Sequence, residues 1–419
     1  MTISSPPVEY NPFVEPHQSN PGAFYDWALR EAPVAYSRAV EAWVVSRYDD
    51  VLAVLTDPRR FSSLAAIPNL YHNPPEVVEI LRAGGVPERD AMTVNNDPPE
   101  HTRLRRILGR VMSPRRFLAL EPAIRRLADE LIDEFVADGR VELAARFINP
   151  LPSRVISELL GIPRDAQDRV EAWVRDMLTL LNPLAPLAAK LPAAHGMVEY
   201  AQFIFGMIRE RRAAPGDDYL SELIHTRIDG YAPLTDDELV HLFREQRAAG
   251  VDSTRGGIAN ALLNLFEHPD LLAALRAEPE LLPRFVEETL RRDHPQRGTV
   301  RVTTEELELG GVRLPKGSRL LLLFSAACRD PARFACPERF DMQRPDLNEH
   351  LGFGKGPHTC PGSALGRLEL RVALEALLAR LPDLRPAPGF VPRYLPSHIF
   401  VTIERLDVEF TPSAASAHA

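Results

Sequence analysis

Apolar residues recur at every third or fourth position through the middle of the chain, from about His101 to about Arg292. This spacing places them on one face of an α-helix. Turn sequences such as Gly161-Ile162-Pro163 and Ala214-Pro215-Gly216 interrupt the pattern, so it predicts several separate helices rather than one.

The two ends of the chain carry shorter, alternating patterns that are typical of small strands. The expected elements are strands at 33–36 and 43–46, a helix over 49–55, small antiparallel strands after Arg301 with turns at 310–311 and 315–317, and a last helix over 363–381. The fold class is therefore mainly α with a small β region. We expect one domain over residues 1–419, with an extended N-terminal segment over 1–20 and a disordered tail over 412–419.

One predicted helix is much longer than the others. Thr235 and Glu238 have the spacing of a capping box, and His268-Pro269 is a stop signal, so the helix between them has roughly 30 residues and is about 45 Å long. Its middle contains Gly250, which weakens a helix interior. Gly250 is either a tolerated residue in a buried helix or a local opening where a ligand approaches the backbone.

Composition and charge narrow the class of protein. Of the 419 residues 45% are hydrophobic and the formal net charge is −9, which gives no overall basic field for nucleic acid. The first 24 residues contain no apolar run that could act as a signal peptide or membrane anchor. Three cysteines are too few for a disulfide framework. These features predict a cytoplasmic enzyme that binds neither nucleic acid nor a membrane, with one cysteine available for chemistry.

The strongest chemical signal is the segment Phe353-Gly354-Lys355-Gly356-Pro357-His358-Thr359-Cys360-Pro361-Gly362. A glycine-rich loop lets the backbone approach a flat cofactor, and a cysteine at a helix start gains thiolate character from the helix dipole. A lone cysteine is more often a small buried apolar residue. The surrounding glycines and the helix start favour the interpretation of Cys360 as a ligand. Cys328 and Cys336 lack this setting and are expected to be structural.

This segment resembles the haem-binding signature of the cytochrome P450 family, Phe-Gly-x-Gly-x-His-x-Cys-x-Gly, and fills every fixed position. The resemblance is to soluble bacterial members. It implies the P450 fold, with haem b (iron protoporphyrin IX) between the long helix and the cysteine loop. It also implies that Cys360 ligates the iron and that Phe353, Gly354 and Gly362 are cofactor-binding residues of the loop. A thiolate ligand favours cleavage of the O–O bond, so the implied activity is monooxygenation with O2.

A second motif, Glu288-Thr289-Leu290-Arg291, is similar to the family's Glu-x-x-Arg. Alone it is a commonplace helical pair. By resemblance it is the buried structural pair near the haem, completed by an arginine from a later loop, and we assign that arginine to Arg339.

The third motif lies in the long helix, where Ala249-Gly250-Val251-Asp252-Ser253-Thr254 resembles the family's Ala-Gly-x-Asp/Glu-Thr-Thr. By resemblance Ala249 and Gly250 lie against the haem, while Asp252, Ser253 and Thr254 govern proton delivery. Ser253 stands where the family usually has threonine. It keeps the hydroxyl but loses the methyl group that restricts its rotamer.

A fourth cluster, Asp97 to Arg106, carries His101 and Arg105 one helical turn apart, where both can reach one anion. By resemblance they hold the haem propionates together with Arg301 and His358. Read alone, the cluster is also compatible with a solvated basic face or a nucleic-acid patch. Arg103 and Arg106 are assigned to the surface, where an acidic ferredoxin could bind.

Electrons must come from outside, because the sequence has no dinucleotide-binding or iron–sulfur motif. By resemblance a ferredoxin and an NAD(P)H-dependent ferredoxin reductase supply them. The substrate is expected to be a small, largely apolar molecule. Its candidate contacts are Glu245, Ala248, Val300 and Phe400. Glu245 either recognises a polar or cationic group of the substrate or forms an ion pair within the protein.

Two other functions remain open at this point. A peroxide-driven haem-thiolate peroxygenase would need no redox partner, but family members of that type tend to lose the pair that Asp252 and Ser253 provide. A non-enzymatic haem sensor or electron carrier is the other. No signalling or DNA-binding domain is visible in the sequence, and a closed electron carrier would not need the oxygen motif. Turnover with hydrogen peroxide, compared with turnover with ferredoxin, reductase and NADH, separates the first of these from monooxygenation.

Overall fold

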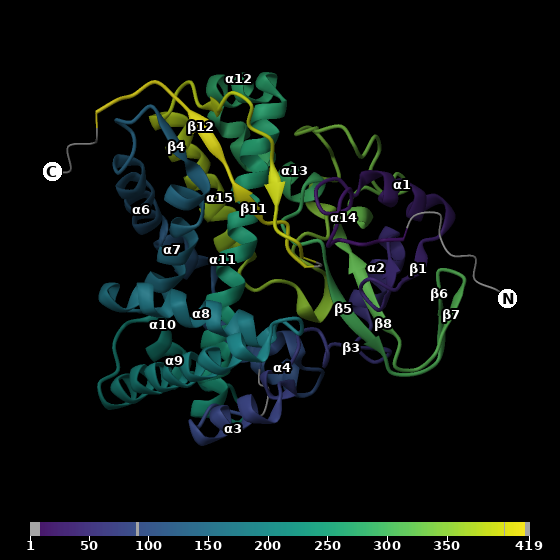
Figure 1. Cartoon of the computed structure of the whole chain (residues 1–419), viewed down its shortest axis with the longest axis vertical. Coiled ribbons are helices and arrows are strands. Elements are labelled where there is room, and N and C mark those ends of the chain that lie inside the picture. The colour runs from purple at the N-terminus through teal and green to yellow at the C-terminus, as the bar shows by residue number, and fades with distance from the viewer. Residues whose placement is uncertain (1–8, 89–91, 398, 415–419) are drawn as a thin grey trace. The chain divides into compact units, whose positions relative to one another are not determined.

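The computed structural model describes residues 9–88, 92–397 and 399–414 (Figure 1). The chain separates into two compact units. Unit 1 comprises residues 1–62, 117–152 and 251–419, and unit 2 comprises residues 63–116 and 153–250. Each unit is therefore built from stretches that lie far apart in the sequence. The expectation of a single domain stays a prediction.

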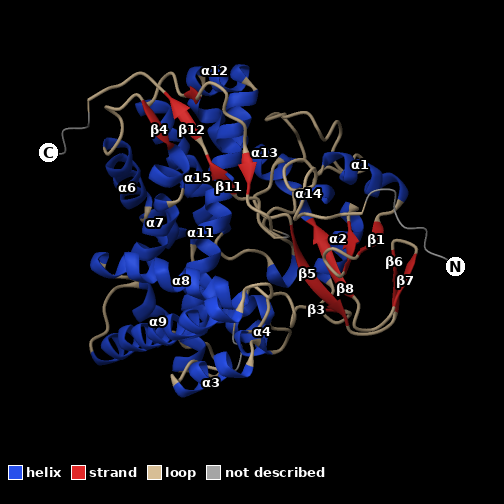
Figure 2. Ribbon diagram, viewed as in Figure 1, coloured by secondary structure: helices blue, strands red, loops and turns tan. Residues whose placement is uncertain are grey.

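Unit 1 contains every strand in the described part of the chain (Figure 2). Its largest sheet has five strands in the order β1-β2-β8-β5-β3. The β2–β8 pair is parallel and the other pairs are antiparallel. The strands are β1 (Val34–Ser37), β2 (Ala42–Val45), β3 (Phe61–Ser62), β5 (Gly298–Thr303) and β8 (Arg319–Leu323).

Side chains from the two faces of this sheet enter two separate hydrophobic clusters. Val45, Leu320 and Leu322 pack with α2 (Tyr48–Thr56) and α14 (Phe324–Ala327). Their neighbours Val44 and Leu321 pack on the other face with α1 (Gly22–Glu31). The sheet is thus buried on both faces, which explains the continuous apolar run of β8.

Three smaller sheets complete the β region of unit 1. Strands β6 and β7 form a hairpin whose turn glycines, Gly310 and Gly311, both have positive φ, as their sequence predicts. The remaining strands pair in the orders β4-β12-β9 and β10-β11. The bounds are β4 (Arg140–Glu142), β6 (Leu307–Leu309), β7 (Val312–Leu314), β9 (Arg385–Pro386), β10 (Arg393–Tyr394), β11 (Ile403–Arg405) and β12 (Asp407–Glu409).

Unit 1 also contains helices that alternate with these strands along the sequence. They are α6 (Glu121–Asp133), α12 (Pro269–Ala277), α13 (Leu282–Arg292) and α15 (Ser363–Arg380), with a π-helix at Ala144–Ile148 and 3₁₀ turns at Pro279–Leu281, Leu347–Glu349 and Gly356–His358. The last helix predicted from sequence, over 363–381, is α15.

Unit 2 is helical. Its elements are α3 (Pro75–Ala83), α4 (Glu100–Val111), α8 (Gln167–Leu181), α9 (Leu187–Ala213) and α10 (Tyr219–His225), with 3₁₀ turns at Leu70–His72, Thr93–Asn95 and Arg164–Ala166. Helices α8 and α9 pack through Trp173 and Tyr200, whose rings stack with centroids 5.7 Å apart. A side chain at Gly84 would collide with Val198, so the glycine allows the close approach of α3 and α9.

Helices α5 (Pro114–Ala119), α7 (Pro150–Leu160) and α11 (Asp236–Glu267) continue from one unit into the other. The long helix α11 has the predicted bounds. The Thr235 amide donates to Glu238 Oε2 at 2.8 Å and the Glu238 amide to Thr235 Oγ1 at 3.2 Å, which is the predicted capping box. The helix is continuous past Gly250, where a Cβ would lie 3.1 Å from Ile156 Cδ1. Gly250 therefore permits α11 to pack on α7.

The prediction of an extended N-terminal segment is wrong for its described part. Residues 12–19 form turns and a bend, and Tyr10 and His17 are buried. Of the predicted tail, residues 412–414 form no regular element and residues 415–419 lie outside the described residues. None of the described helices is long and apolar enough to cross a membrane.

Candidate active site

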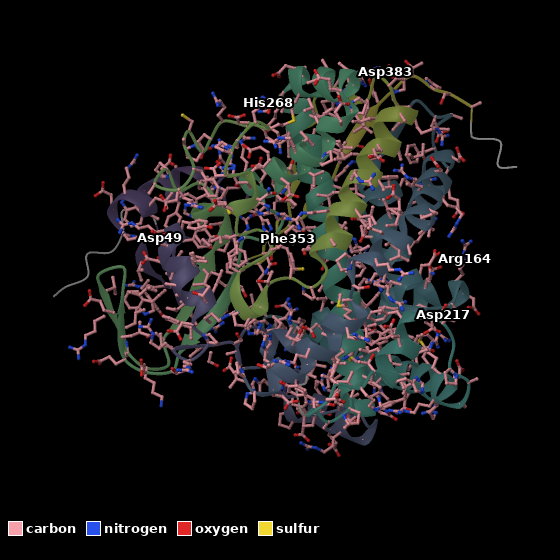
Figure 3. The ribbon with its side chains drawn as sticks, turned by 180° about the vertical axis from the view of Figure 1, so that it is seen from behind. Asp49, Arg164, Asp217, His268, Phe353 and Asp383 are labelled. Carbon is pink, nitrogen blue, oxygen red and sulfur yellow. The ribbon has the colours of Figure 1, made fainter. Side chains whose placement is uncertain are left out.

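The cysteine loop leads directly into α15. It begins at Phe353, labelled in Figure 3, whose carbonyl oxygen accepts the Cys360 amide at 2.8 Å. The loop needs its glycines, because Gly354 and Gly356 have φ of 66° and 71° and a Cβ at Gly356 would lie 2.6 Å from Leu55 O. Cys360 is partly accessible and stands two residues before Gly362, the N-cap of α15. An accessible sulfur at the positive end of a long helix suits a thiolate ligand to iron.

The other two cysteines have a different setting. Cys328 is fully buried, and burial raises the pKa of its thiol to about 11, although the Leu351 amide donates to its sulfur at 3.2 Å. Cys336 is exposed on a loop. Within the described residues, no group of three or more His, Cys, Asp or Glu side chains could hold a metal ion. Of the three cysteines, only Cys360 is both partly accessible and next to the start of a long helix.

The oxygen-motif residues lie on α11 as predicted. Asp252 and Ser253 are partly exposed and Thr254 is buried. Asp252 Oδ1 accepts a hydrogen bond from Arg255 Nη1 at 3.1 Å, and Arg255 Nε donates to Asn149 O at 3.2 Å. Sequence analysis missed Arg255. Its position one turn after Asp252 is a signal, but such pairs are common on helices.

The predicted propionate ligands are divided between the two units. In unit 1, Arg301 is a buried residue of β5 whose Nη1 donates to Val300 O at 2.7 Å, and His358 is a partly exposed residue of the cysteine loop. In unit 2, His101 is buried and Arg105 half-buried, one turn apart on α4. The α4 pair has the predicted spacing.

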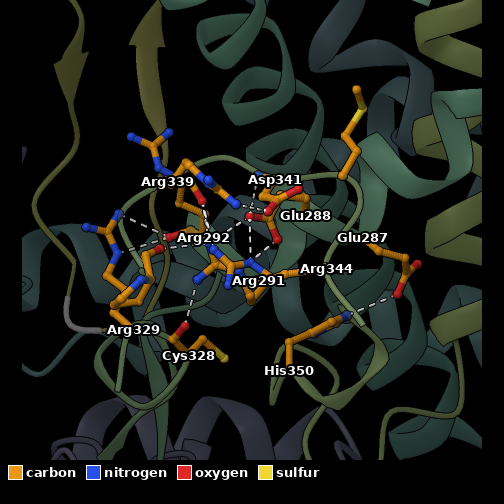
Figure 4. A network of polar contacts seen from close by, with 12 residues as sticks. Glu287, Glu288, Arg291, Arg292, Cys328, Arg329, Arg339, Asp341, Arg344 and His350 are labelled. Atoms are coloured by element: carbon orange, nitrogen blue, oxygen red, sulfur yellow. Dashed lines mark hydrogen bonds and ion pairs between the residues drawn. The ribbon is translucent and has the colours of Figure 1, made fainter. Parts of the chain in front are cut away.

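The Glu-x-x-Arg motif forms a fully buried ion pair (Figure 4). Arg291 Nε and Nη2 donate to the two oxygens of Glu288 at 2.7 and 2.8 Å. The third member is not Arg339, whose side chain is 70% exposed and pairs with Asp341. It is Arg344, which is 4% exposed and donates from Nε to Glu288 Oε1 at 3.2 Å. The earlier assignment is wrong because Arg339 contributes only its carbonyl, which accepts from Arg344 Nη2 at 2.9 Å.

Glu245 is engaged within unit 2. Its carboxylate accepts hydrogen bonds from the Thr93 amide at 2.8 Å, the Thr93 hydroxyl at 2.6 Å and the Val94 amide at 2.9 Å. These contacts support the alternative in which the Glu245 carboxylate binds groups within the protein and not the substrate. These donors belong to the 3₁₀ turn Thr93–Asn95.

Two further assignments change. Val300 is 3% exposed and belongs to the core cluster that includes Tyr10 and Phe24, so it is a core residue and not a substrate contact. Arg103 is not a free surface cation, because its guanidinium is 12% exposed and pairs with Glu100 and Glu238. Ala248 and Phe400 are half-buried, and their assignment to the substrate remains a prediction.

Comparison with known proteins decides the family. The sequence profile described as Cytochrome P450 matches residues 78–382. The chain belongs to the cytochrome P450 family. P450 members bind haem b, and the accessible Cys360, the glycine loop and the start of α15 fit that cofactor. The chain is a P450 monooxygenase, in agreement with its hydroxylase and monooxygenase relatives.

Cytochrome P450 107B1 of Saccharopolyspora erythraea is 38% identical, with 86% of this chain and 87% of that protein covered. The 6-deoxyerythronolide B hydroxylase of the same organism is also 38% identical, with 85% and 87% covered. Among solved P450 structures, the haem domain from Tepidiphilus thermophilus has a TM-score of 0.88 at 30% identity, covering 96% and 97% of the two chains. An intact type IV self-sufficient P450 monooxygenase gives 0.90 at 30% identity, covering 96% of this chain and 53% of that one.

Proposed function

We propose that Cys360 would ligate the haem iron and that the haem would bind between α11 and the Cys360 loop. The observation that carries this proposal is a partly accessible thiol at the start of α15, inside a complete P450 signature loop. Neither of the other two cysteines combines accessibility with a helix start.

When bound, a haem with a thiolate ligand activates dioxygen for insertion of one oxygen atom into a substrate and release of the other as water. The chain must deliver protons to that reaction. Asp252 is the proposed proton carrier. Its bond to Arg255 holds the carboxylate on one side of α11, and release of that bond would free it to exchange protons with solvent. Ser253 supplies the hydroxyl beside it, and Thr254 is a second hydroxyl on the same turn.

We assign the propionates to His101, Arg105, Arg301 and His358, which provide cationic or donor groups of the kind that bind carboxylates. The substrate is proposed to be a largely apolar organic molecule. Relatives are named for 6-deoxyerythronolide B and mycinamicin IV, so those two compounds are the first to screen. Electrons are proposed to come from a ferredoxin and its NAD(P)H-dependent reductase in the cytoplasm.

The first experiment is the carbon monoxide difference spectrum of the reduced protein and of Cys360→Ser. We expect the wild-type protein to give the long-wavelength Soret band that defines thiolate ligation, and the variant to lose it. Cys328→Ser is the matched control and should keep the band. If Cys360→Ser kept it too, the ligand assignment would be wrong.

The second experiment tests the proton-delivery residues by the ratio of product formed to NADH consumed. Asp252→Asn keeps the shape of the side chain but removes its proton exchange, so turnover should fall by roughly 10²-fold, the lower range for general acid–base groups. Ser253→Thr should raise the ratio because the added methyl group restricts the hydroxyl. Wild-type turnover with hydrogen peroxide that exceeded turnover with ferredoxin, reductase and NADH would instead favour the peroxygenase.

A further inference from the structure

Glu287 lies next to the buried Glu288 on α13 but has a different set of partners (Figure 4). Its Oε1 accepts from Arg367 Nε at 2.5 Å, and its Oε2 accepts from Arg367 Nη2 at 2.9 Å and from His350 Nε2 at 3.1 Å. The side chain is 12% exposed. Burial raises the pKa of Glu287, but the hydrogen bonds from His350 and Arg367 outweigh it and lower the value to about 2. The carboxylate is therefore ionised and accepts three N–H donors.

One of these partners fixes the chain just before the cysteine loop. The Gly352 amide donates to His350 Nδ1 at 3.1 Å. His350 can accept there and donate to Glu287 only as the neutral tautomer with its proton on Nε2. A Cβ at Gly352 would lie 2.5 Å from the His294 ring and 2.7 Å from His350 Nδ1, so the backbone is held between two imidazoles.

The other partner fixes the first residue of the loop. The Arg367 guanidinium lies over the Phe353 ring, 4.4 Å from its centroid. The same residue, Phe353, accepts the Cys360 amide at its carbonyl oxygen. Through Arg367 and His350, Glu287 thus holds both the ring of Phe353 and the backbone at Gly352, seven and eight residues before the sulfur.

We propose that Glu287 is a positioning residue for the thiolate: it fixes the base of the Cys360 loop and so maintains the geometry in which the sulfur ligates iron. This inference rests on the proposed assignment of Cys360 as the iron ligand. It separates two adjacent carboxylates by role. Glu288 joins α13 to the 339–344 loop, and Glu287 joins α13 to the ligand loop.

The test is Glu287→Gln in the haem-loaded protein. A glutamine has the same shape but a single acceptor oxygen, and its NH2 group would face one of the three donors. The readout is the rate at which the long-wavelength Soret band of the reduced carbon monoxide complex converts to the short-wavelength band in mild urea. We expect this rate to rise on the order of fivefold, the factor that corresponds to one lost hydrogen bond. Glu287→Asp should restore part of the wild-type rate.

Glu121→Gln is the matched control. Glu121 also accepts three N–H donors, from Arg125 Nε, Arg125 Nη2 and Arg371 Nη2, but these donors lie on α6 and α15 and not in the Cys360 loop. If both variants converted at the wild-type rate, or both at the same raised rate, Glu287 would be only a general stabilising residue and the proposal would be overturned. A wild-type protein without the long-wavelength band would refute the ligand assignment instead.

Arg367→Lys provides a second measurement should Glu287→Gln fail to fold. Lysine can still pair with Glu287 but cannot lie flat on the Phe353 ring. Faster conversion than in Arg371→Lys, a control on the same helix, would support the route through Phe353. Equal rates in these two variants would overturn it.

Discussion

At the scale of single residues, the Glu-x-x-Arg motif predicts that a third residue completes the buried ion pair, but it does not say which arginine that is. The carboxylate of Glu288 accepts two hydrogen bonds from Arg291 and a third from another arginine, which is Arg344. Both Arg339 and Arg344 follow α13 in the sequence at a plausible distance. Only Arg344 is buried beside the carboxylate.

The first prediction follows from this difference. Arg344→Met should lower the free energy of unfolding by about 3–5 kcal/mol, the cost of leaving a buried charge without one partner. Arg339→Met should change it by less than about 1 kcal/mol, since the Arg339–Asp341 pair is largely exposed. Urea unfolding of the two variants measures both values. A larger loss in Arg339→Met would contradict the structural assignment.

Residue-level prediction from sequence succeeded where a motif fixes a position and failed where only spacing was available. Glu288 and Arg291 form the buried pair that their motif predicts. Cys360 lies next to the start of α15, as its motif predicts, and its role as the iron ligand stays a prediction. Val300 was misassigned because alternation along β5 does not reveal which face meets the core. Arg255 is hard to recognise because acid–base pairs at helical spacing are frequent on any surface. Glu287 carries no local signal because its partners Arg367 and His350 lie 80 and 63 positions away in the sequence.

At the scale of elements, local signals were reliable. The capping box and the His268-Pro269 stop define α11, and the glycine pair defines the β6–β7 hairpin. Pairings between distant segments could not be predicted. The parallel contact of β2 with β8 joins residues that are more than 270 positions apart, and no periodicity in either segment encodes its partner.

The second prediction concerns two helical glycines in different surroundings. A Cβ at Gly109 of α4 would meet nothing within 4 Å, so Gly109→Ala should raise the free energy of unfolding by about 0.5–1 kcal/mol. A Cβ at Gly256 of α11 would lie 2.7 Å from Val401 O and 2.8 Å from Pro295 Cβ. Gly256→Ala should therefore lower the free energy of unfolding by about 1–3 kcal/mol. Thermal unfolding checks both signs, and a stabilised Gly256→Ala would contradict the packing described here.

At the scale of the whole molecule, buried titratable groups make stability depend on pH. Burial lowers the pKa of His294 to about 4 from its ordinary value of 6.5, against the opposing hydrogen bond to Gln296. Between these values the unfolded chain binds the proton and the folded chain does not, so stability falls as the pH decreases. Glu287 adds a loss at lower pH, between 4.5 and about 2, because its folded form stays ionised.

The third prediction isolates the histidine. The free energy of unfolding should decrease by on the order of 3 kcal/mol on account of His294 as the pH falls from about 6.5 to about 4. His294→Asn keeps an acceptor near the Gln296 amide but cannot titrate. The difference between the free-energy profiles of wild type and variant with pH should therefore equal the contribution of His294. Parallel profiles between pH 4 and 6.5 would show that His294 binds a proton equally well in both states.

The distribution of the two units along the chain also sets an order of events during synthesis. Unit 2 ends at residue 250, whereas unit 1 requires residues up to β12, which pairs with β4 near residue 141. At about 5–20 residues per second, the ribosome needs roughly 10 to 30 s to synthesise the chain from residue 251 to the end of β12. During that interval the 140–142 segment lacks its partner β12. An unpaired strand edge can associate with other nascent chains. Unit 1 therefore closes only after β12 has emerged from the ribosome.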